Sequence, residues 1–145
     1  MIEIMIDGRS LSKSGAAFSV MLRSGKHCWK RSLILGKVTS NFAEMKAFEF
    51  ALKSIDPSFF NEELSVITSG RYVMLMLELE NDKWSKTPKI NIDLVSEVRS
   101  LVEKFSEISV KHSSSLSGAL EKDFVALRAL TEDAVLKGKE ISERI

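Results

Sequence analysis

The chain has 145 residues, of which 44% are hydrophobic and 28% are charged, and its formal net charge is +1. This length is enough for one domain with a full hydrophobic core, and the small net charge excludes a strong global attraction to nucleic acid or anionic membranes. Cys28 is the single cysteine, which excludes an internal disulfide and a cysteine-based zinc site. No run approaches the roughly 20 apolar residues that span a bilayer. The first residues resemble a strand rather than a secretory leader, so we expect a cytoplasmic, intracellular monomer without membrane association.

The N-terminal third of the sequence predicts three strands. Residues 2–7 alternate in polarity, with isoleucines on one face and Asp7 on the other. Residues 16–22 and 27–35 predict two further strands, joined by a turn at 24–26. Consecutive strands with tight turns predict an antiparallel meander.

The pattern then becomes helical. Asn41 is a good N-cap, and Glu44 follows three positions later, as in a capping box. Apolar residues recur at helical spacing as far as Ile55, and Pro57 ends the helix.

Strands and helices alternate through the rest of the chain. The expected elements are a strand at 64–68, a helix at 72–79, a polar loop at 81–89, a helix at 92–105, a strand at 108–110, a serine-rich loop at 112–118 and one helix from 119 to the end. The order βββ-α-β-α-α-β-α predicts an α/β fold, in which helices flank a five-stranded mixed sheet whose first three strands are antiparallel. We expect one domain spanning 1–145.

Three separated carboxylates are the candidates for chemistry. Asp7 ends a strand, Glu44 lies in a first helical turn and Asp123 lies near a helix start. Carboxylates from several elements can converge to hold magnesium ions that cleave a phosphodiester. Each also has a structural interpretation, as a turn residue, a capping residue and a partner of the helix dipole respectively. Spacing alone leaves both interpretations open.

A series of short motifs resembles the ribonuclease H family, in the family's order and over nearly the whole chain. They are Ile6-Asp7-Gly8, the segment TSNFAE at 39–44, the segment TSGRYV at 68–73, Trp84 followed by KINIDL at 89–94, Val110-Lys111-His112, and Asp123. The resemblance implies a type 1-like ribonuclease H fold. It also implies metal-dependent hydrolysis of the RNA strand of RNA–DNA hybrids.

The resemblance further implies roles for individual residues. Asp7, Glu44 and Asp123 look like three of the family's four acids, which would bind Mg²⁺ or Mn²⁺ as the cofactor. His112 looks like the histidine that assists product release or proton movement. The residues expected to contact a nucleic-acid partner are Thr39, Asn41, Arg71, Trp84 and Lys86.

The fourth acid of the family is missing. Ser69 stands at that position, and a neutral hydroxyl supplies neither the charge nor the bridging of a carboxylate. The site is therefore degenerate, and we expect hydrolysis to be weak or lost. The alternative hypothesis is a non-catalytic ribonuclease H-like module that binds nucleic acid or a protein partner.

Overall fold

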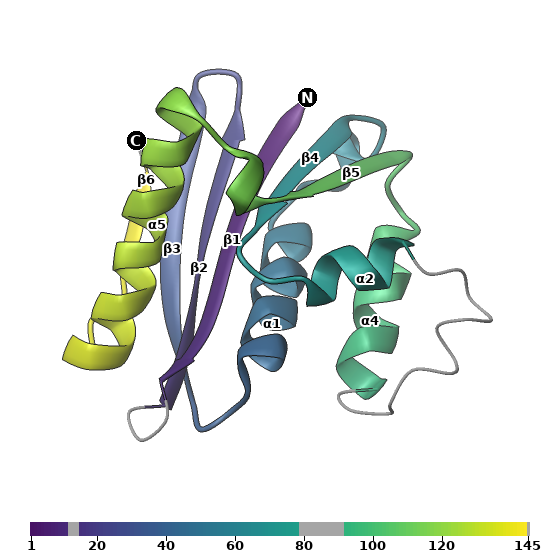
Figure 1. Cartoon of the computed structure of the whole chain (residues 1–145). Helices are drawn as coiled ribbons and strands as arrows, with labels where there is room; N and C mark the ends of the chain where they lie inside the picture. Colours follow the sequence, from purple (N-terminus) through teal and green to yellow (C-terminus); the bar gives the residue numbers. More distant parts are fainter. Residues whose placement is uncertain (12–14, 79–91, 145) are drawn as a thin grey trace.

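The structure is a computed structural model and describes residues 1–11, 15–78 and 92–144. A mixed sheet lies at its centre, with α1, α2 and α4 on one face and α5 on the other (Figure 1). The strands are β1 (Ile2–Leu11), β2 (Gly15–Ser24), β3 (His27–Gly36), β4 (Glu63–Thr68), β5 (Glu107–His112) and β6 (Ser142–Arg144). The α-helices are α1 (Ser40–Lys53), α2 (Tyr72–Glu78), α4 (Ile92–Val102) and α5 (Gly118–Lys137), and short 3-10 helices are formed by Pro57–Phe59 and Ser113–Ser115.

The strand order is β5-β4-β1-β2-β3-β6. β1, β2 and β3 are antiparallel, as predicted, and β4 and β5 run parallel to β1. β1 is longer than the predicted strand at 2–7, because the polar segment after Asp7 continues it as far as Leu11, where it pairs with Gly15. This register places Asp7 opposite Ser19 of β2.

The prediction of five strands is wrong, because the C-terminal residues form a sixth. α5 does not continue to the end of the chain but stops before Gly138, whose left-handed backbone (φ 64°) ends the helix. The returning chain covers the edge of β3. The Ser32 N–H donates to the Ile141 carbonyl (3.0 Å), the Ile141 N–H donates to Ser32 Oγ (2.9 Å), and β6 then pairs with β3.

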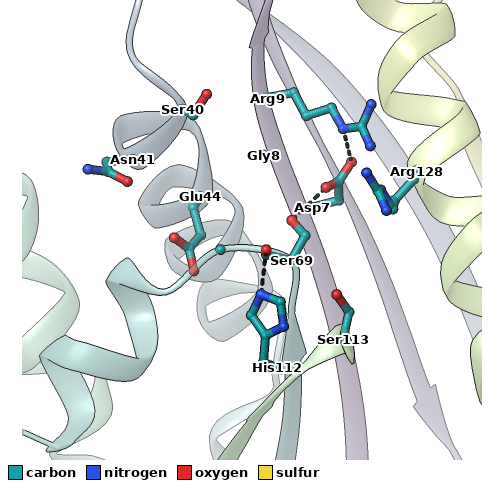
Figure 2. Close-up of a pocket in the computed structure, with 11 residues that line it drawn as sticks. Asp7, Gly8, Arg9, Ser40, Asn41, Glu44, Ser69, His112, Ser113 and Arg128 are labelled. Atoms are coloured by element: carbon teal, nitrogen blue, oxygen red, sulfur yellow. Dashed lines mark hydrogen bonds and ion pairs between the residues drawn. The ribbon is translucent and has the colours of Figure 1, made fainter. Parts of the chain in front are cut away.

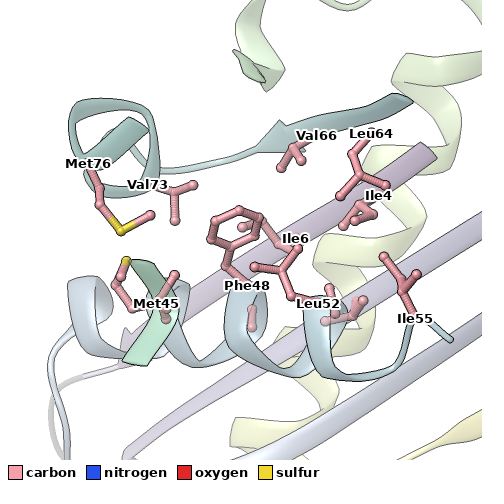
Figure 3. Close-up of a cluster of buried hydrophobic side chains, with 14 of the residues drawn as sticks. Ile4, Ile6, Met45, Phe48, Leu52, Ile55, Leu64, Val66, Val73 and Met76 are labelled. Atoms are coloured by element: carbon pink, nitrogen blue, oxygen red, sulfur yellow. The ribbon is translucent and has the colours of Figure 1, made fainter. Parts of the chain in front are cut away.

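The alternation of β1 divides the core between the two faces of the sheet. The isoleucines of β1 pack against α1, where Phe48 and Leu52 are almost completely buried (Figure 3). On the opposite face, Met5 packs against Phe124 and Leu127 of α5. Asp7 shares the face of Met5, so its side chain points toward α5. In the described part of the chain, no helix is long and apolar enough to cross a membrane.

A close approach of β1 to α1 positions the start of that helix. A Cβ atom on Gly8 would lie 2.3 Å from the backbone nitrogen of Glu44 and 2.5 Å from the carbonyl carbon of Ala43. A glycine is therefore needed for α1 to lie this close to β1. The contact brings the first turns of α1 beside the strand residue that follows Asp7.

Candidate functional site

The carboxyl ends of the parallel strands β4 and β5 meet beside the second half of β1. In open α/β sheets, ligands bind outside this edge. A cavity of about 420 Å³ opens there, between the strands, the N-terminus of α1 and the side of α5 (Figure 2). Its lining is mostly polar and consists of Asp7, Gly8, Arg9, Ser40, Asn41, Glu44, Ser69, Gly70, His112, Ser113 and Arg128. The cavity therefore contains five of the residues predicted from the sequence, namely Asp7, Asn41, Glu44, Ser69 and His112.

Asp7 lies at the base of the cavity and is fully buried. The Ser69 hydroxyl donates a hydrogen bond of 2.6 Å to Asp7 Oδ1. Ser69 is itself held in place, because its N–H donates to the Ile6 carbonyl across the β1–β4 junction (3.3 Å). Asp7 Oδ2 accepts no hydrogen bond from the described residues, and Nε of Arg9 lies 3.6 Å away as an ion-pair partner. The Ser69 hydroxyl thus donates to Asp7, whereas a carboxylate at position 69 would repel the Asp7 carboxylate.

Glu44 is also buried, but other groups of the protein already occupy its carboxylate. Thr68 Oγ1 donates to Glu44 Oε2 (2.7 Å), and the N–H groups of Tyr72 and Val73 donate to Oε1 and Oε2 (3.1 and 3.2 Å). Burial raises the pKa of the Glu44 carboxyl above its ordinary value, and these hydrogen bonds offset part of that rise. Gly70 allows the arrangement, because a Cβ there would lie only 2.4 Å from Glu44 Oε1. Glu44 therefore ties α1 to the β4–α2 connection.

The predicted capping box is wrong. The N-cap of α1 is Thr39, not Asn41, and Thr39 Oγ1 accepts the N–H of Phe42 (3.1 Å). Glu44 is consequently beyond the N3 position, and its side chain points away from the helix start toward Thr68. The N-cap is therefore two residues earlier than predicted, and Ser40 and Asn41 already have helical geometry.

Asp123 does not join the other two acids, so the expected convergence of three carboxylates is not formed. Its Oδ2 accepts a hydrogen bond of 2.9 Å from Arg23 on β2, and Arg23 also lies 3.4 Å from Glu3. Asp123 holds the pKa of the Arg23 guanidinium above its ordinary value. Thr131, eight residues further along α5, is the residue that bonds Ser19 (2.8 Å) opposite Asp7. Eight helical residues span about 12 Å, so Asp123 lies roughly two turns of α5 away from the level of Asp7.

His112 ends β5 and borders the cavity. Its Nε2 lies 2.9 Å from the Ser69 carbonyl, which can only accept, so Nε2 carries a proton and donates. Its Nδ1 accepts the N–H of Ser114 (3.1 Å) and lies 2.8 Å from the Ser114 hydroxyl. The ring therefore links β5 to the Ser69 corner in an orientation fixed on both sides.

The residues predicted to contact nucleic acid are dispersed. Asn41 lines the cavity, whereas the Thr39 hydroxyl is used as the helix cap. Arg71 is exposed at the β4–α2 corner and does not line the cavity. Trp84 and Lys86 lie outside the described residues.

Sequence reasoning missed two arginines that lie beside Asp7, one from β1 and one from α5 (Figure 2). Arg9 pairs with Asp7 and donates a hydrogen bond to Glu132 of α5 (2.5 Å). Its position two residues after Asp7 in a strand could have placed it on the same face. Arg128 reaches the cavity from α5, and no local signal in the sequence indicates which turn of that helix faces β1.

These residues do not fit a pair of divalent cations. Among the described residues, no group of three or more His, Cys, Asp or Glu lies close enough to hold a metal ion. Magnesium prefers several converging oxygen ligands. Asp7 offers one uncommitted oxygen, which faces a guanidinium, and both Glu44 oxygens already accept hydrogen bonds.

The strand order, with an antiparallel β1–β3 meander followed by parallel β4 and β5, defines an α/β protein with a ribonuclease H-like fold. No protein-family model and no curated protein sequence matches the chain. Solved structures do match it. The type 1 enzyme LC9-RNase H1, which carries the type 2 active-site motif, has a TM-score of 0.75 at 14% identity, covering 99% of this chain and 76% of that one.

Two further structures match over almost their whole length. RNase H1 from the halophilic archaeon Halobacterium salinarum has a TM-score of 0.61 at 20% identity, covering 95% of this chain and 98% of that one. LC11-RNase H1 in complex with an RNA/DNA hybrid has a TM-score of 0.67 at 17% identity, covering 95% of this chain and 99% of that one. At these identities the similarity establishes the fold, and the ribonuclease H resemblance seen in the sequence is confirmed at that level.

Proposed function

We propose that this protein binds RNA–DNA hybrids or another nucleic acid through its ribonuclease H-like fold, and that it cleaves them weakly or not at all. One observation carries the proposal: each of the three acids is committed to a partner within the protein. Asp7 accepts from Ser69, Glu44 accepts from Thr68 and two backbone N–H groups, and Asp123 accepts from Arg23. The apolar pattern that forms the core is intact, so the departures from the ribonuclease H pattern fall on residues of the candidate site.

Support for a nucleic-acid ligand comes from the fold and from the cavity. LC11-RNase H1 and the foamy viral protease-reverse transcriptase were both solved with an RNA/DNA hybrid. The viral protein is 19% identical with a TM-score of 0.69, and the match covers 94% of this chain but 20% of the viral one. The cavity offers two guanidinium groups, hydroxyls and an amide, which are groups that contact phosphates. Since the net charge is only +1, binding must depend on such a local group.

A second candidate is the metal-dependent hydrolase that the sequence resemblance implies. The observation that favours it is Asp7 Oδ2, a buried carboxylate oxygen without a hydrogen-bond donor among the described residues. The first candidate remains the better supported, because Arg9 and Ser69 meet the charge of Asp7 and no other acid lies free beside it.

The deciding experiment is a cleavage assay on an RNA–DNA hybrid with Mg²⁺ and then Mn²⁺. We expect the wild type to cleave weakly or not at all compared with Asp7→Asn, which serves as the matched control. Activity that appears in Ser69→Asp but not in the wild type would support the degenerate-site account. Robust wild-type cleavage that Asp7→Asn abolishes would refute the non-catalytic proposal.

Binding is tested separately by a gel-shift titration in which the salt concentration is varied. Neutralised phosphates release counterions, so the logarithm of the binding constant should fall linearly with the logarithm of salt concentration. A flat response would exclude the nucleic-acid proposal and favour the alternative of a protein partner. We retain a monomeric state, a single domain and a cytoplasmic location as predictions.

A further inference from the structure

Arg128 is the cavity residue whose role is least explained. It lies on α5 with its side chain directed toward the cavity beside Asp7 (Figure 2). It makes no hydrogen bond or ion pair with any other residue that the structure describes. An arginine that borders a cavity and has no internal partner is available to an external anion.

The other charges of the cavity are met inside the protein. Arg9 is shared between Asp7 and Glu132. Asp7 also accepts from Ser69, and the Glu44 carboxylate accepts three hydrogen bonds. The positive charge of Arg128 is therefore the one without an opposite partner among the described residues of the site.

Neutral donors line the same cavity as this charge, Ser40 and Asn41 on the side of α1 and Ser113 after β5 (Figure 2). The hydroxyl of Ser40 accepts the N–H of Ser10 (3.1 Å), so its own proton remains free to donate outward. Asn41 and Ser113 line the same cavity and make no side-chain hydrogen bond to the described residues. A guanidinium in a cavity that also offers free hydroxyl donors is a set of groups that recognises phosphate oxygens.

We propose that the cavity binds one backbone phosphate of the nucleic acid directly through Arg128, with Ser113, which lines both cavities together with Arg128, as an additional donor. This inference rests on the proposed function, since it assigns the contact by which that binding is made. It differs from metal-mediated binding because the positive charge is supplied by the protein.

A second cavity provides space beside the phosphate for the rest of a nucleic-acid chain. This cavity of about 260 Å³ adjoins the first, with which it shares His112, Ser113 and Arg128. Its remaining wall consists of the apolar residues Leu116, Phe124 and Val125, of which Val125 is 60% exposed, together with Ser114 and the acid Glu121. A phosphate held at Arg128 would leave the adjoining sugar and base against this apolar wall.

The first test uses inorganic phosphate as the probe on the full chain. The midpoint of thermal unfolding should rise with phosphate relative to chloride at the same ionic strength, because a ligand of the folded state stabilises it. Arg128→Gln should reduce that rise to the general stabilisation that phosphate gives as an excluded salt. Lys122→Gln is the matched control, since Lys122 is exposed on the same helix and does not line either cavity. An equal rise in Arg128→Gln and wild type, or no rise in the wild type, would overturn the inference.

The second test uses an RNA–DNA hybrid without divalent cations. Arg128→Gln should weaken binding and reduce the salt slope by about one, whereas Lys122→Gln should leave the slope unchanged. Asp7→Asn should strengthen binding by about threefold or more, the effect of removing one like charge screened as in water. In a parallel titration with Mg²⁺ present, a metal-dependent site requires the opposite result, because Asp7→Asn would then remove a ligand of the cation.

The two proposals fail in different ways. If phosphate stabilises the protein through Arg128 but the hybrid does not bind, the phosphate site stands and the proposed function is refuted. If the hybrid binds with a normal salt slope that Arg128→Gln does not change, the proposed function stands and the Arg128 contact is wrong.

Discussion

Replacing Ser69 with aspartate would restore the acid that the ribonuclease H resemblance expects, and it tests the electrostatics of the cavity most directly. In the wild type, the Ser69 hydroxyl donates to a fully buried carboxylate at 2.6 Å. The substitution removes that donor and places a second carboxylate against the first. We therefore expect Ser69→Asp to destabilise the protein at neutral pH in the absence of metal ions.

The size of the effect follows from the separation of the charges. Two carboxylates about 4 Å apart repel by about 4 kcal/mol at an effective dielectric constant of about 20. Because position 69 is half-buried, solvent screening reduces this repulsion to about 2–3 kcal/mol. The isosteric control Ser69→Asn keeps a donor and adds no charge, so it should remain within about 1 kcal/mol of the wild type.

Urea unfolding at several pH values measures the difference between the two variants. One of the two neighbouring carboxyls in Ser69→Asp should hold its proton to higher pH than an isolated aspartate, because both cannot ionise freely. Its pKa is then raised in the folded state. The contribution of this carboxyl to the free energy of unfolding is therefore highest at acidic pH and is lost as the pH rises through its folded-state pKa. A constant difference between Ser69→Asp and Ser69→Asn from acidic to neutral pH would refute the contact between positions 7 and 69.

Three further predictions concern the scaffold of the site. Gly8→Ala should cost about 3 kcal/mol or prevent folding, since its Cβ would meet backbone atoms of Glu44 and Ala43; a smaller loss in urea unfolding would show that α1 moves freely on β1. Burial raises the pKa of Glu44, so this residue favours the folded state at acidic pH and loses that contribution as the pH rises through its folded pKa. Glu44→Gln should remove this component from the pH profile of stability, and an unchanged profile would contradict it. Thr39→Ala should cost about 1 kcal/mol as a lost N-cap, while Thr39→Ser should retain stability; equal losses would show that the methyl group matters and not the hydroxyl.

The parts of the fold that were predictable depend on local patterns. The alternation of residues 2–7 specified which face of β1 carries Asp7, and the antiparallel meander followed from short turns. The parallel strands were indicated by their alternation with helices. β6 was missed because its three residues carry no periodic signal and pair only through the tertiary return of the chain onto β3.

The site was predictable only where a residue's position follows from its own strand or corner. Ser69 was placed beside Asp7 by the order of the motifs, and the structure brings them together. Glu44 was assigned to a helix start, but its true partners, Thr68 and the first N–H groups of α2, are distant in sequence. Polar side chains with nearby donors satisfy each other locally, and a sequence does not reveal which donors are near.

The placement of α5 decides the chemistry of the cavity. A helix can present any of its turns to a strand, and moving it by two turns exchanges the residue that faces Asp7 without changing its amphipathic pattern. Here Leu127 and Phe124 pack on Met5, the hydrogen bond from Thr131 to Ser19 fixes the register, and Arg128 reaches the cavity in the place where an acid was expected. Asp123 is retained at the level of Arg23 by an ion pair whose partners are each about one-third exposed. Such a pair contributes at most about 1 kcal/mol to stability, so the apolar contacts of α5 supply most of the free energy that fixes its position along the sheet. It follows that Arg23→Gln alone should not bring Asp123 to Asp7. The apolar packing of α5 on the sheet, and not this ion pair, places the Arg128 guanidinium at the cavity.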